Sequence, residues 1–340
     1  MRSSSSGPCS TMRYWMHSTN DEGEVPAVHP DKGHTPIDYG ALPTEQRNPR
    51  SHDLDRRSVD DILRLINQED RHVPEAVGAE IPHIADAVRA IVRSLEAGGR
   101  VIYVGAGTSG RIGLLDALEW APTFGVDPSI IRPVVAGGVA ATIDSAAEVE
   151  DDANAGAAEI AALSCAHTDV VVGLAASGVT PFVLGAVAEA KRRGATVIGV
   201  SNVPGSPLSA ASQIAITPLV GPEVLTGSTR MKAGTSQKLV LNMLSTAAMI
   251  LRGKVYSNLM VDLAPRNRKL VARAHRIIAA ATGLSIPESA KLLDQSGGQV
   301  KVAIVMALGK TDRATAEARL QLAGGHVHKA LGGGHDAAPR

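Results

Sequence analysis

Three segments of the chain combine glycine with serine or threonine immediately before an expected helix. Glycine lets the backbone approach a ligand closely, while hydroxyls and the free N–H groups at the positive end of a helix donate hydrogen bonds to phosphate oxygens. Serine and threonine also cap helices that bind nothing, so one such segment would be weak evidence. Three at one edge of a sheet predict a pocket for a phosphate-type anion. The segments are Gly105-Ala106-Gly107-Thr108-Ser109-Gly110-Arg111, Ala175-Ala176-Ser177-Gly178-Val179-Thr180-Pro181 and Thr226-Gly227-Ser228-Thr229-Arg230-Met231-Lys232. The candidate ligands are Gly107, Thr108, Ser109, Ser177, Gly178, Thr180, Ser228 and Thr229, together with Arg230 and Lys232, for which a structural salt bridge is an equal alternative.

The first segment also matches the G-x-G-x-x-G pattern of dinucleotide-binding proteins. That pattern requires an acidic residue at the end of the following strand, where it holds the ribose. Here the following strand ends in Val134-Val135-Ala136-Gly137-Gly138, which contains no carboxylate. The sequence therefore argues against a dinucleotide site.

The elements expected around these segments alternate between strand and helix. Short apolar runs predict strands, and stretches with helical periodicity between them predict helices. Such alternation implies a parallel sheet of roughly five strands with helices on both faces, a three-layer αβα sandwich of the α/β class. Ligands of open α/β sheets bind beyond the carboxyl ends of the strands, which is where the first two segments follow. The strands are expected at 101–104, 131–136, 169–173, 196–200 and 214–219, and the helices at 109–119, 153–163, 181–193 and 232–251.

Helical patterns also precede and follow this central part. Ser58 is a suitable N-cap for a first helix, and a second is expected at 74–96, while four more are expected at 270–281, 287–293, 300–308 and 314–322. We therefore expect a small C-terminal helical domain. The division that we predict is a disordered extension over 1–42, a helical segment over 43–90, the sheet-containing domain over 91–254, the C-terminal helical domain over 265–331 and a flexible tail over 332–340.

Composition and charge narrow the class of protein. Lys+Arg and Asp+Glu both number 34, so no basic excess suggests binding to nucleic acid or to an anionic membrane. The uncharged stretch over 170–188 is interrupted by Ser177-Gly178-Val179-Thr180-Pro181, which is typical of a strand, a turn and a helix start rather than a membrane span. The two cysteines, Cys9 and Cys165, form no disulfide framework, and no signal peptide is evident. We expect a cytoplasmic protein.

Several stretches of the chain resemble the sugar isomerase (SIS) phosphosugar-binding domain and, more specifically, the N-acetylmuramic acid 6-phosphate etherase family. The likeness extends from about Pro43 to Leu331, and the run Gly227-Ser228-Thr229-Arg230-Met231-Lys232-Ala233-Gly234-Thr235 is highly specific to that family. The other matching stretches are Thr44-Glu45-Gln46-Arg47-Asn48-Pro49, Gly105 to Gly113, Pro122-Thr123-Phe124-Gly125, Glu150-Asp151-Asp152, Gly221-Pro222-Glu223-Val224 and Asn258-Leu259-Met260-Val261-Asp262.

This resemblance implies a reaction. It is the loss of D-lactate from C3 of N-acetylmuramate 6-phosphate, followed by addition of water to give N-acetylglucosamine 6-phosphate, in amino-sugar catabolism and cell-wall recycling. A base must take the C2 proton, which the open-chain aldehyde acidifies, and an acid must protonate the lactyl oxygen. By motif position, the family's two catalytic glutamates correspond to Glu119 and Glu150. We assign Glu119 as the acid and Glu150 as the C2 base, although the roles can be exchanged. The elimination needs no metal and no organic cofactor.

The position of Glu119 creates a geometric difficulty. It lies about ten residues beyond the first segment, so a straight helix would carry it about 15 Å from the phosphate. Either the helix ends early, or the sugar bound at the loops of one subunit meets Glu119 of another. We expect the second arrangement, a homodimer whose active sites lie near the subunit interface. Without the resemblance, both glutamates would be interpreted as ordinary solvated residues.

Some positions depart from the family's pattern. Leu118, Trp120 and Ala121 replace a usual serine, cysteine and proline around the first glutamate, and Val179 stands where the second loop usually has arginine. We expect these changes to lie near the pocket and to affect substrate affinity. Two alternatives remain open: a non-catalytic phosphosugar sensor, which needs the loops without both glutamates, and an aldose–ketose isomerase, whose product retains every substituent.

Overall fold

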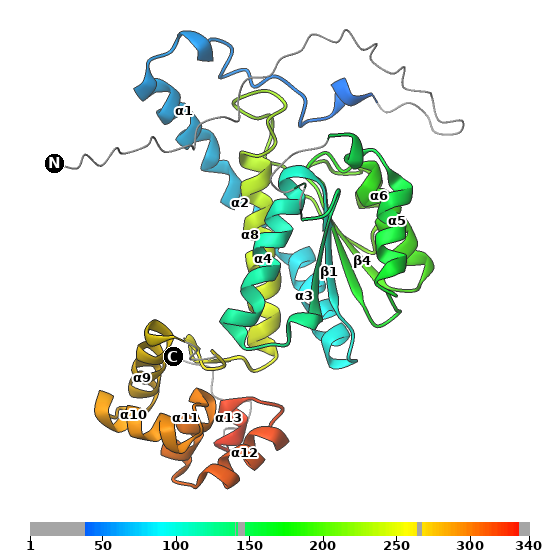
Figure 1. Ribbon diagram of the computed structural model, residues 1–340. Coiled ribbons are helices and arrows are strands. Elements are labelled where there is room, and N and C mark those ends of the chain that lie inside the picture. The colour runs from blue at the N-terminus through cyan, green and yellow to red at the C-terminus, as the bar shows by residue number, and fades with distance from the viewer. Residues whose placement is uncertain (1–37, 140, 142–146, 264–266, 333–340) are drawn as a thin grey trace, which may run out of the picture. The chain divides into compact units, whose positions relative to one another are not determined.

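The computed structural model describes residues 38–139, 141, 147–263 and 267–332 of the chain (Figure 1). The predicted extension over 1–42 therefore lies almost entirely outside the described residues, and only its last residues are seen, where Tyr39–Ala41 form a 3-10 turn. The predicted tail over 332–340 lies outside them as well, except for Gly332. None of the helices within the described ranges is long and apolar enough to cross a membrane.

Five parallel strands form the central sheet. They are β1 (Val101–Gly105), β2 (Ile131–Val135), β3 (Val170–Leu174), β4 (Thr196–Val200) and β5 (Ile214–Ile216), in the spatial order β2-β1-β3-β4-β5. Strand β2 lies on one side of β1, and β3 lies on the other side. The direction in which successive strands are added to the sheet therefore reverses between β1 and β3. In open α/β sheets the crevice at such a reversal is the usual ligand site. The predicted parallel sheet is confirmed.

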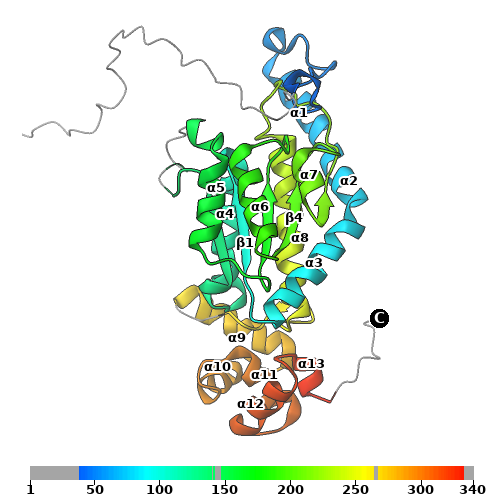
Figure 2. The same ribbon diagram turned by 90° about the vertical axis from the view of Figure 1, so that its right-hand side faces the viewer.

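Helices cover both faces of this sheet, as the sequence predicts. In Figures 1 and 2, α3 (Ile81–Glu96), α4 (Gly107–Phe124) and α8 (Lys232–Leu251) lie on one face, and α5 (Ala153–Ala162), α6 (Pro181–Arg192) and α7 (Pro207–Ala211) lie on the other. Successive side chains of a strand point to opposite faces of the sheet, so each strand contributes to the apolar cores on both faces. In β1, Val101 and Tyr103 belong to one core, and Ile102 and Val104 belong to the other. The three-layer sandwich is confirmed.

The helical segment before the sheet differs from the prediction in one respect. Ser58 caps α1 (Val59–Asp70) as expected, its hydroxyl accepting a hydrogen bond from the Asp61 backbone N–H. The single helix predicted over 74–96 is wrong, since it divides at Glu80 into α2 (His72–Ala79) and α3. Pro82 explains the break, because its ring clashes with the carbonyl four residues earlier and it lacks an N–H to continue the helix.

Helix α4 is longer than the predicted 109–119. It continues through Pro122 and ends at Gly125, whose φ of +60° lies in the left-handed region and where a Cβ would collide with the backbone carbonyl of Asp262. Asp116, buried in the middle of α4, joins α4 to α8, since its carboxylate lies 3.4 Å both from Lys238 Nζ and from Ser245 Oγ. These contacts tie α4, which is one uninterrupted helix, to α8.

The C-terminal helices pack around a separate apolar core. The four predicted helices are observed as α9 (Arg268–Thr282), α10 (Ile286–Gln295), α11 (Val300–Gly309) and α12 (Arg313–Leu322). A short α13 (Val327–Ala330) and an antiparallel pair, β6 (Val255–Tyr256) with β7 (Leu259–Met260), were not predicted. Elements this short contain too few residues to show a period in the sequence.

Candidate active site

The first loop joins the end of β1 to the start of α4. Gly107 has a φ of +51°, and Thr108 and Ser109 follow it in the first turn of the helix. The N-cap residue is Ala106, whose methyl group gives the helix no side-chain acceptor. The first N–H groups of α4 therefore point beyond the sheet edge without a capping side chain, which is the arrangement that favours an anion.

The second loop lies beside the first, because β1 and β3 are neighbours and Gly105 is in register with Leu174. Thr180 occupies the N-cap of α6 but makes no side-chain capping bond, so this helix start is also open. Ser177 Oγ accepts only a long hydrogen bond, 3.4 Å, from Val179 N. Gly178 has a structural role, since its φ is +71° and a Cβ there would collide with Ser206.

The third loop leads into α8, but the start of this helix is already occupied. The carboxylate of Glu223 accepts hydrogen bonds from the backbone N–H groups of Lys232 (3.0 Å) and Ala233 (2.9 Å). Burial raises the pKa of Glu223, although these two N–H groups act in the opposite direction. The motif Gly221–Val224 is one of the stretches that resemble the family, but the sequence alone predicts no function for it. The structure makes Glu223 the cap that fixes the third loop.

Lys232 is turned away from the loops toward the N-terminal segment. Its ammonium group lies 2.8 Å from Glu69 Oε2, and the two residues are only 2% and 5% exposed. Glu69 also accepts a hydrogen bond from Asn48 Nδ2 (2.8 Å) and pairs with Arg50 (3.0 Å). Burial opposes ionisation of Glu69, but these donors outweigh it and lower its pKa. Of the two interpretations of Lys232, the contacts favour the salt bridge. Arg230 is exposed and stays a candidate ligand.

Removal of the Glu69 carboxylate is expected to destabilise the fold. Glu69→Ala leaves the Lys232 charge buried without its partner, which should lower the free energy of unfolding at neutral pH by about 3 kcal/mol. Because the folded-state pKa of Glu69 is lowered, its stabilisation is lost as the pH falls through that pKa, so the difference should shrink in acid. Urea unfolding at pH 7 measures it. Glu75→Ala, at an exposed position of α2, is the control, and equal stability of the two variants would contradict the assignment.

Contacts between residues of the three loops bring them to one edge of the sheet. A Cβ at Gly234, in the first turn of α8, would lie 3.6 Å from Thr108 Cγ2 of the first loop. Asn202 N donates to Ala176 O (2.8 Å) in the second loop, and Asn202 Nδ2 donates to Ser236 Oγ (2.8 Å) of α8. The predicted gathering of hydroxyl-bearing loops is therefore present in the fold, although whether they bind phosphate stays a prediction.

Glu150 joins this group. It closes a 3-10 turn (Ala147–Glu150), and its Oε1 lies 2.8 Å from the position that a Cβ on Gly107 would occupy. Glycine at position 107 thus leaves room for the carboxylate against the start of α4. Burial raises the pKa of Glu150, the negative charge of Asp151 raises it further, and Arg111 acts in the opposite direction. A carboxyl with a raised pKa beside an uncapped helix start is suited to acid–base chemistry.

Glu119 lies far from Glu150 within one chain. It is exposed on α4, and twelve residues of unbroken helix separate it from Gly107, a rise of about 18 Å. The alternative in which the helix ends before Glu119 is therefore wrong. Leu115, one turn before Glu119, and Leu118, which directly precedes it, are 51% and 64% exposed. Glu119 thus belongs to an apolar outer face rather than to the loops of its own chain.

Two of the residues that depart from the family pattern, Trp120 and Val179, are buried. Trp120 is 1% exposed and packs in the core, where its indole N–H donates to Asp116 (3.1 Å) and its ring meets Tyr103 edge-on. The expectation that the indole lies near the pocket is therefore wrong. Val179, within the second loop, is also buried, so its side chain contributes packing to that loop.

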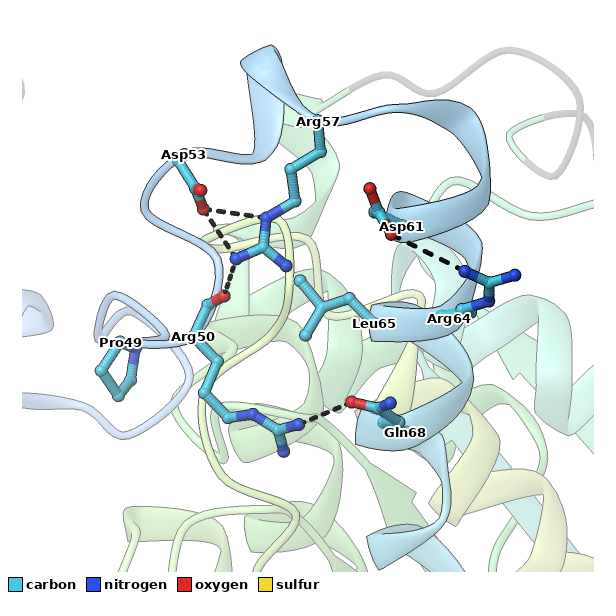
Figure 3. A pocket seen from close by; sticks show the side chains of 8 residues that line it. All are labelled: Pro49, Arg50, Asp53, Arg57, Asp61, Arg64, Leu65 and Gln68. Carbon is cyan, nitrogen blue, oxygen red and sulfur yellow. Dashed lines mark hydrogen bonds and ion pairs between the residues drawn. The ribbon is translucent and has the colours of Figure 1, made fainter.

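A hollow of about 670 Å³ lies instead in the N-terminal segment (Figure 3). Two of its three arginines are paired with carboxylates that also line it, because Arg57 pairs with Asp53 (2.7 Å) and Arg64 lies 3.8 Å from Asp61. None of the predicted site residues lines it. The residues that line it are Pro49, Arg50, Asp53, Arg57, Asp61, Arg64, Leu65 and Gln68.

Two family models match the sheet-containing part of the chain. A model of the SIS domain matches residues 147–247, and a model of the glucokinase regulatory protein N-terminal SIS domain matches residues 83–191. The chain is 50% identical over 295 residues to the N-acetylmuramic acid 6-phosphate etherase of Serratia proteamaculans, covering 87% of this chain and 99% of that protein. It is also 50% identical over 295 residues to the protein of the same name from Rubrobacter xylanophilus, covering 87% and 97%. A phosphoheptose isomerase structure from Francisella tularensis is similar at 22% identity and a TM-score of 0.44, covering 57% of this chain and 99% of that one.

Proposed function

Because the chain belongs to the N-acetylmuramic acid 6-phosphate etherase family, we propose that it eliminates D-lactate from N-acetylmuramate 6-phosphate with Glu150 and Glu119 of two subunits. The observation that supports this activity is the 50% sequence identity to etherases over nearly the whole of their length. The chain is a carbon–oxygen lyase acting on a phosphorylated amino sugar. The proposal concerns the residues and the subunits that perform the reaction.

The phosphate is held by the starts of α4 and α6. Both helices lack a capping side chain, and Thr108, Ser109 and Ser177 supply hydroxyl donors around them. The third helix start, at α8, already holds the Glu223 carboxylate, so Ser228, Thr229 and Arg230 contribute side chains rather than a helix terminus. This division supports a phosphate bound between the first two loops.

The reaction follows from the open-chain sugar. Glu150 takes the C2 proton, the C3–oxygen bond breaks, and Glu119 protonates the lactyl oxygen so that D-lactate leaves. The same Glu119 then removes a proton from water, which adds to C3 of the unsaturated aldehyde, and Glu150 returns its proton to C2. The product is N-acetylglucosamine 6-phosphate. A raised pKa makes Glu150 a stronger base, and the proton balance closes without a metal or cofactor.

A second subunit supplies Glu119. The outer face formed by α4 and α8 exposes Leu115 and Leu118 on one helix and Met243 and Ile250 on the other. Neighbouring exposed apolar side chains of this kind mark a protein–protein contact. A two-fold axis through this face would bring Glu119 of each chain toward the loops of its partner, as an isologous dimer allows. We further assign the protein to the cytoplasm, consistent with the buried free thiol of Cys165.

The pH dependence of lactate release tests the base directly. The base must be ionised, so activity is lost as the pH falls through its raised pKa. Asp151→Asn removes a charge that raises this pKa, and the acidic limb of kcat/KM should therefore move to lower pH. Glu148→Gln, in the same acidic run but exposed, is the control. An acidic limb that Asp151→Asn leaves in place would contradict the assignment of Glu150.

The assay for this profile is the release of lactate by the purified protein from N-acetylmuramate 6-phosphate. Well-folded protein that binds the sugar but releases no lactate would favour a phosphosugar sensor. A product that keeps the lactyl group would favour an isomerase. The presence of both Glu119 and Glu150 supports the enzyme.

A further inference from the structure

Two amides at the loop edge of the sheet have polar atoms without a hydrogen-bond partner. Gln237 of α8 is 1% exposed, and neither its Oε1 nor its Nε2 bonds to another group within the described part of the chain. Asn202, which follows β4, is 2% exposed and leaves Oδ1 unpaired. Nearly all buried polar atoms in folded proteins are hydrogen-bonded, and leaving one unpaired is costly. These amides therefore require an explanation.

Contacts locate Asn202 beside the second loop and place the turn of α8 that carries Gln237 beside the first loop. Asn202 is tied to the second loop through Ala176 and to α8 through Ser236. Gln237 follows Ser236 and lies three residues after Gly234, which faces Thr108 of the first loop. Side chains of a helix lean toward its N-terminus, so the Gln237 amide lies level with the turn that meets Thr108.

The unpaired atoms select one kind of ligand group. They comprise two acceptors, Asn202 Oδ1 and Gln237 Oε1, and one donor, Gln237 Nε2. A phosphate dianion presents only acceptors, so two carbonyl oxygens would repel it, whereas a hydroxyl both donates and accepts. In a pyranose 6-phosphate, the oxygen on C5, next to the phosphate-bearing carbon, is a ring ether without a proton. In the open-chain form the same oxygen is a hydroxyl.

We propose that Gln237 and Asn202 hydrogen-bond the C5 hydroxyl of the bound sugar phosphate and thereby favour its open-chain form. In ring opening the C1–O5 bond breaks, C1 becomes a carbonyl, and the proton of the C1 hydroxyl is transferred to O5. The amides stabilise the product of that step and form no covalent bond. This inference rests on the proposed function, because elimination requires the open-chain aldehyde.

Two stable analogues test the inference by calorimetry. Glucitol 6-phosphate is an open chain with a C5 hydroxyl, and 1,5-anhydroglucitol 6-phosphate is a locked ring with an ether at that position. The wild-type protein should bind the open chain about tenfold more tightly. Gln237→Met, which keeps the volume and removes the amide, should weaken binding of the open chain and bring the two affinities close together. Equal binding of the analogues by the wild type, or no binding of either, would overturn the inference whether or not the variant folds.

A control separates recognition from a structural effect. Ser289 also has a buried, unpaired hydroxyl, but it lies on α10, whose Leu293 belongs to the C-terminal core. Ser289→Ala should leave the preference unchanged. A purely structural Gln237 would change the melting temperature of the Met variant while its preference stays at the wild-type value, and this result would also overturn the inference. Failure of the proposed function would be recognised separately, as wild-type protein that releases no lactate from N-acetylmuramate 6-phosphate.

Discussion

Replacement of Glu150 by glutamine is expected to reduce lactate release by about a thousandfold, because general acid–base catalysis contributes roughly 10²–10⁴ to a rate. Glutamine keeps the size of the side chain and the space against Gly107, but it cannot accept the C2 proton. Binding should survive, since the loops and both open helix starts remain. The measurement is kcat for lactate release, together with the affinity for glucitol 6-phosphate.

The control for this variant is Glu148→Gln, two residues away in the same acidic run and exposed to solvent. It should retain the wild-type rate. A Glu150→Gln protein that releases lactate at a rate close to that of Glu148→Gln would remove Glu150 from the mechanism. A Glu150→Gln protein that loses ligand binding as well would instead indicate a role in forming the pocket.

Replacement of Glu119 by glutamine is expected to cause a loss of similar size, about a hundredfold to ten-thousandfold. The exposed position of Glu119 makes this result informative, because an exposed helix residue normally tolerates a neutral substitution. The fold should be unaffected, so the melting temperature of the variant should equal that of the wild type. Lactate release under single-turnover conditions measures the loss.

Glu159→Gln provides the comparison for Glu119. Glu159 is also an exposed helical glutamate, but it lies on α5, on the opposite face of the sheet. Its variant should be fully active. Wild-type activity in Glu119→Gln would contradict the shared site, because the reaction would then proceed without the Glu119 carboxylate.

The sequence was sufficient to predict the architecture because its signals are local. Lys232 and Leu251 were predicted as the bounds of the long helix, and α8 has those bounds. The Ser58 cap is likewise encoded by a residue and its helical neighbours. The parallel sheet followed from apolar runs alternating with helices. In each of these cases the deciding residues lie within a few positions of one another.

Tertiary partners explain what the sequence did not reveal. Lys232 and Glu69 are 163 positions apart, so nothing local distinguishes a phosphate-binding lysine from a buried ion pair. Glu223 caps α8 from nine residues upstream of Lys232, across the whole third loop. The unpaired amide of Gln237 depends on burial, which is a property of the folded chain. Pairing and burial of this kind become visible only once the helices are packed.

Trp120 illustrates a different failure. The buried face of α4 carries Gly113, Asp116, Ala117, Trp120 and Phe124, which recur at spacings of three and four. A helix that ends at Glu119 hides this pattern, because Trp120 and Phe124 then fall outside it. Successive residues of a helix point about 100° apart, so Trp120 can face the core while Glu119 faces outward. Because the predicted helix ended at Glu119, the prediction did not assign Trp120 to the buried face and expected it near the pocket.

A heterodimer built from the two inactive variants tests the shared site most directly. Glu119→Gln and Glu150→Gln chains, co-expressed with different affinity tags and purified through both, combine one site lacking both acids with one site that is intact. Because an isologous dimer has two equivalent sites, the heterodimer should release lactate at about half the wild-type rate, while each homodimer stays nearly inactive. A heterodimer as inactive as its parents would contradict the account, because the two glutamates would then have to act within a single chain.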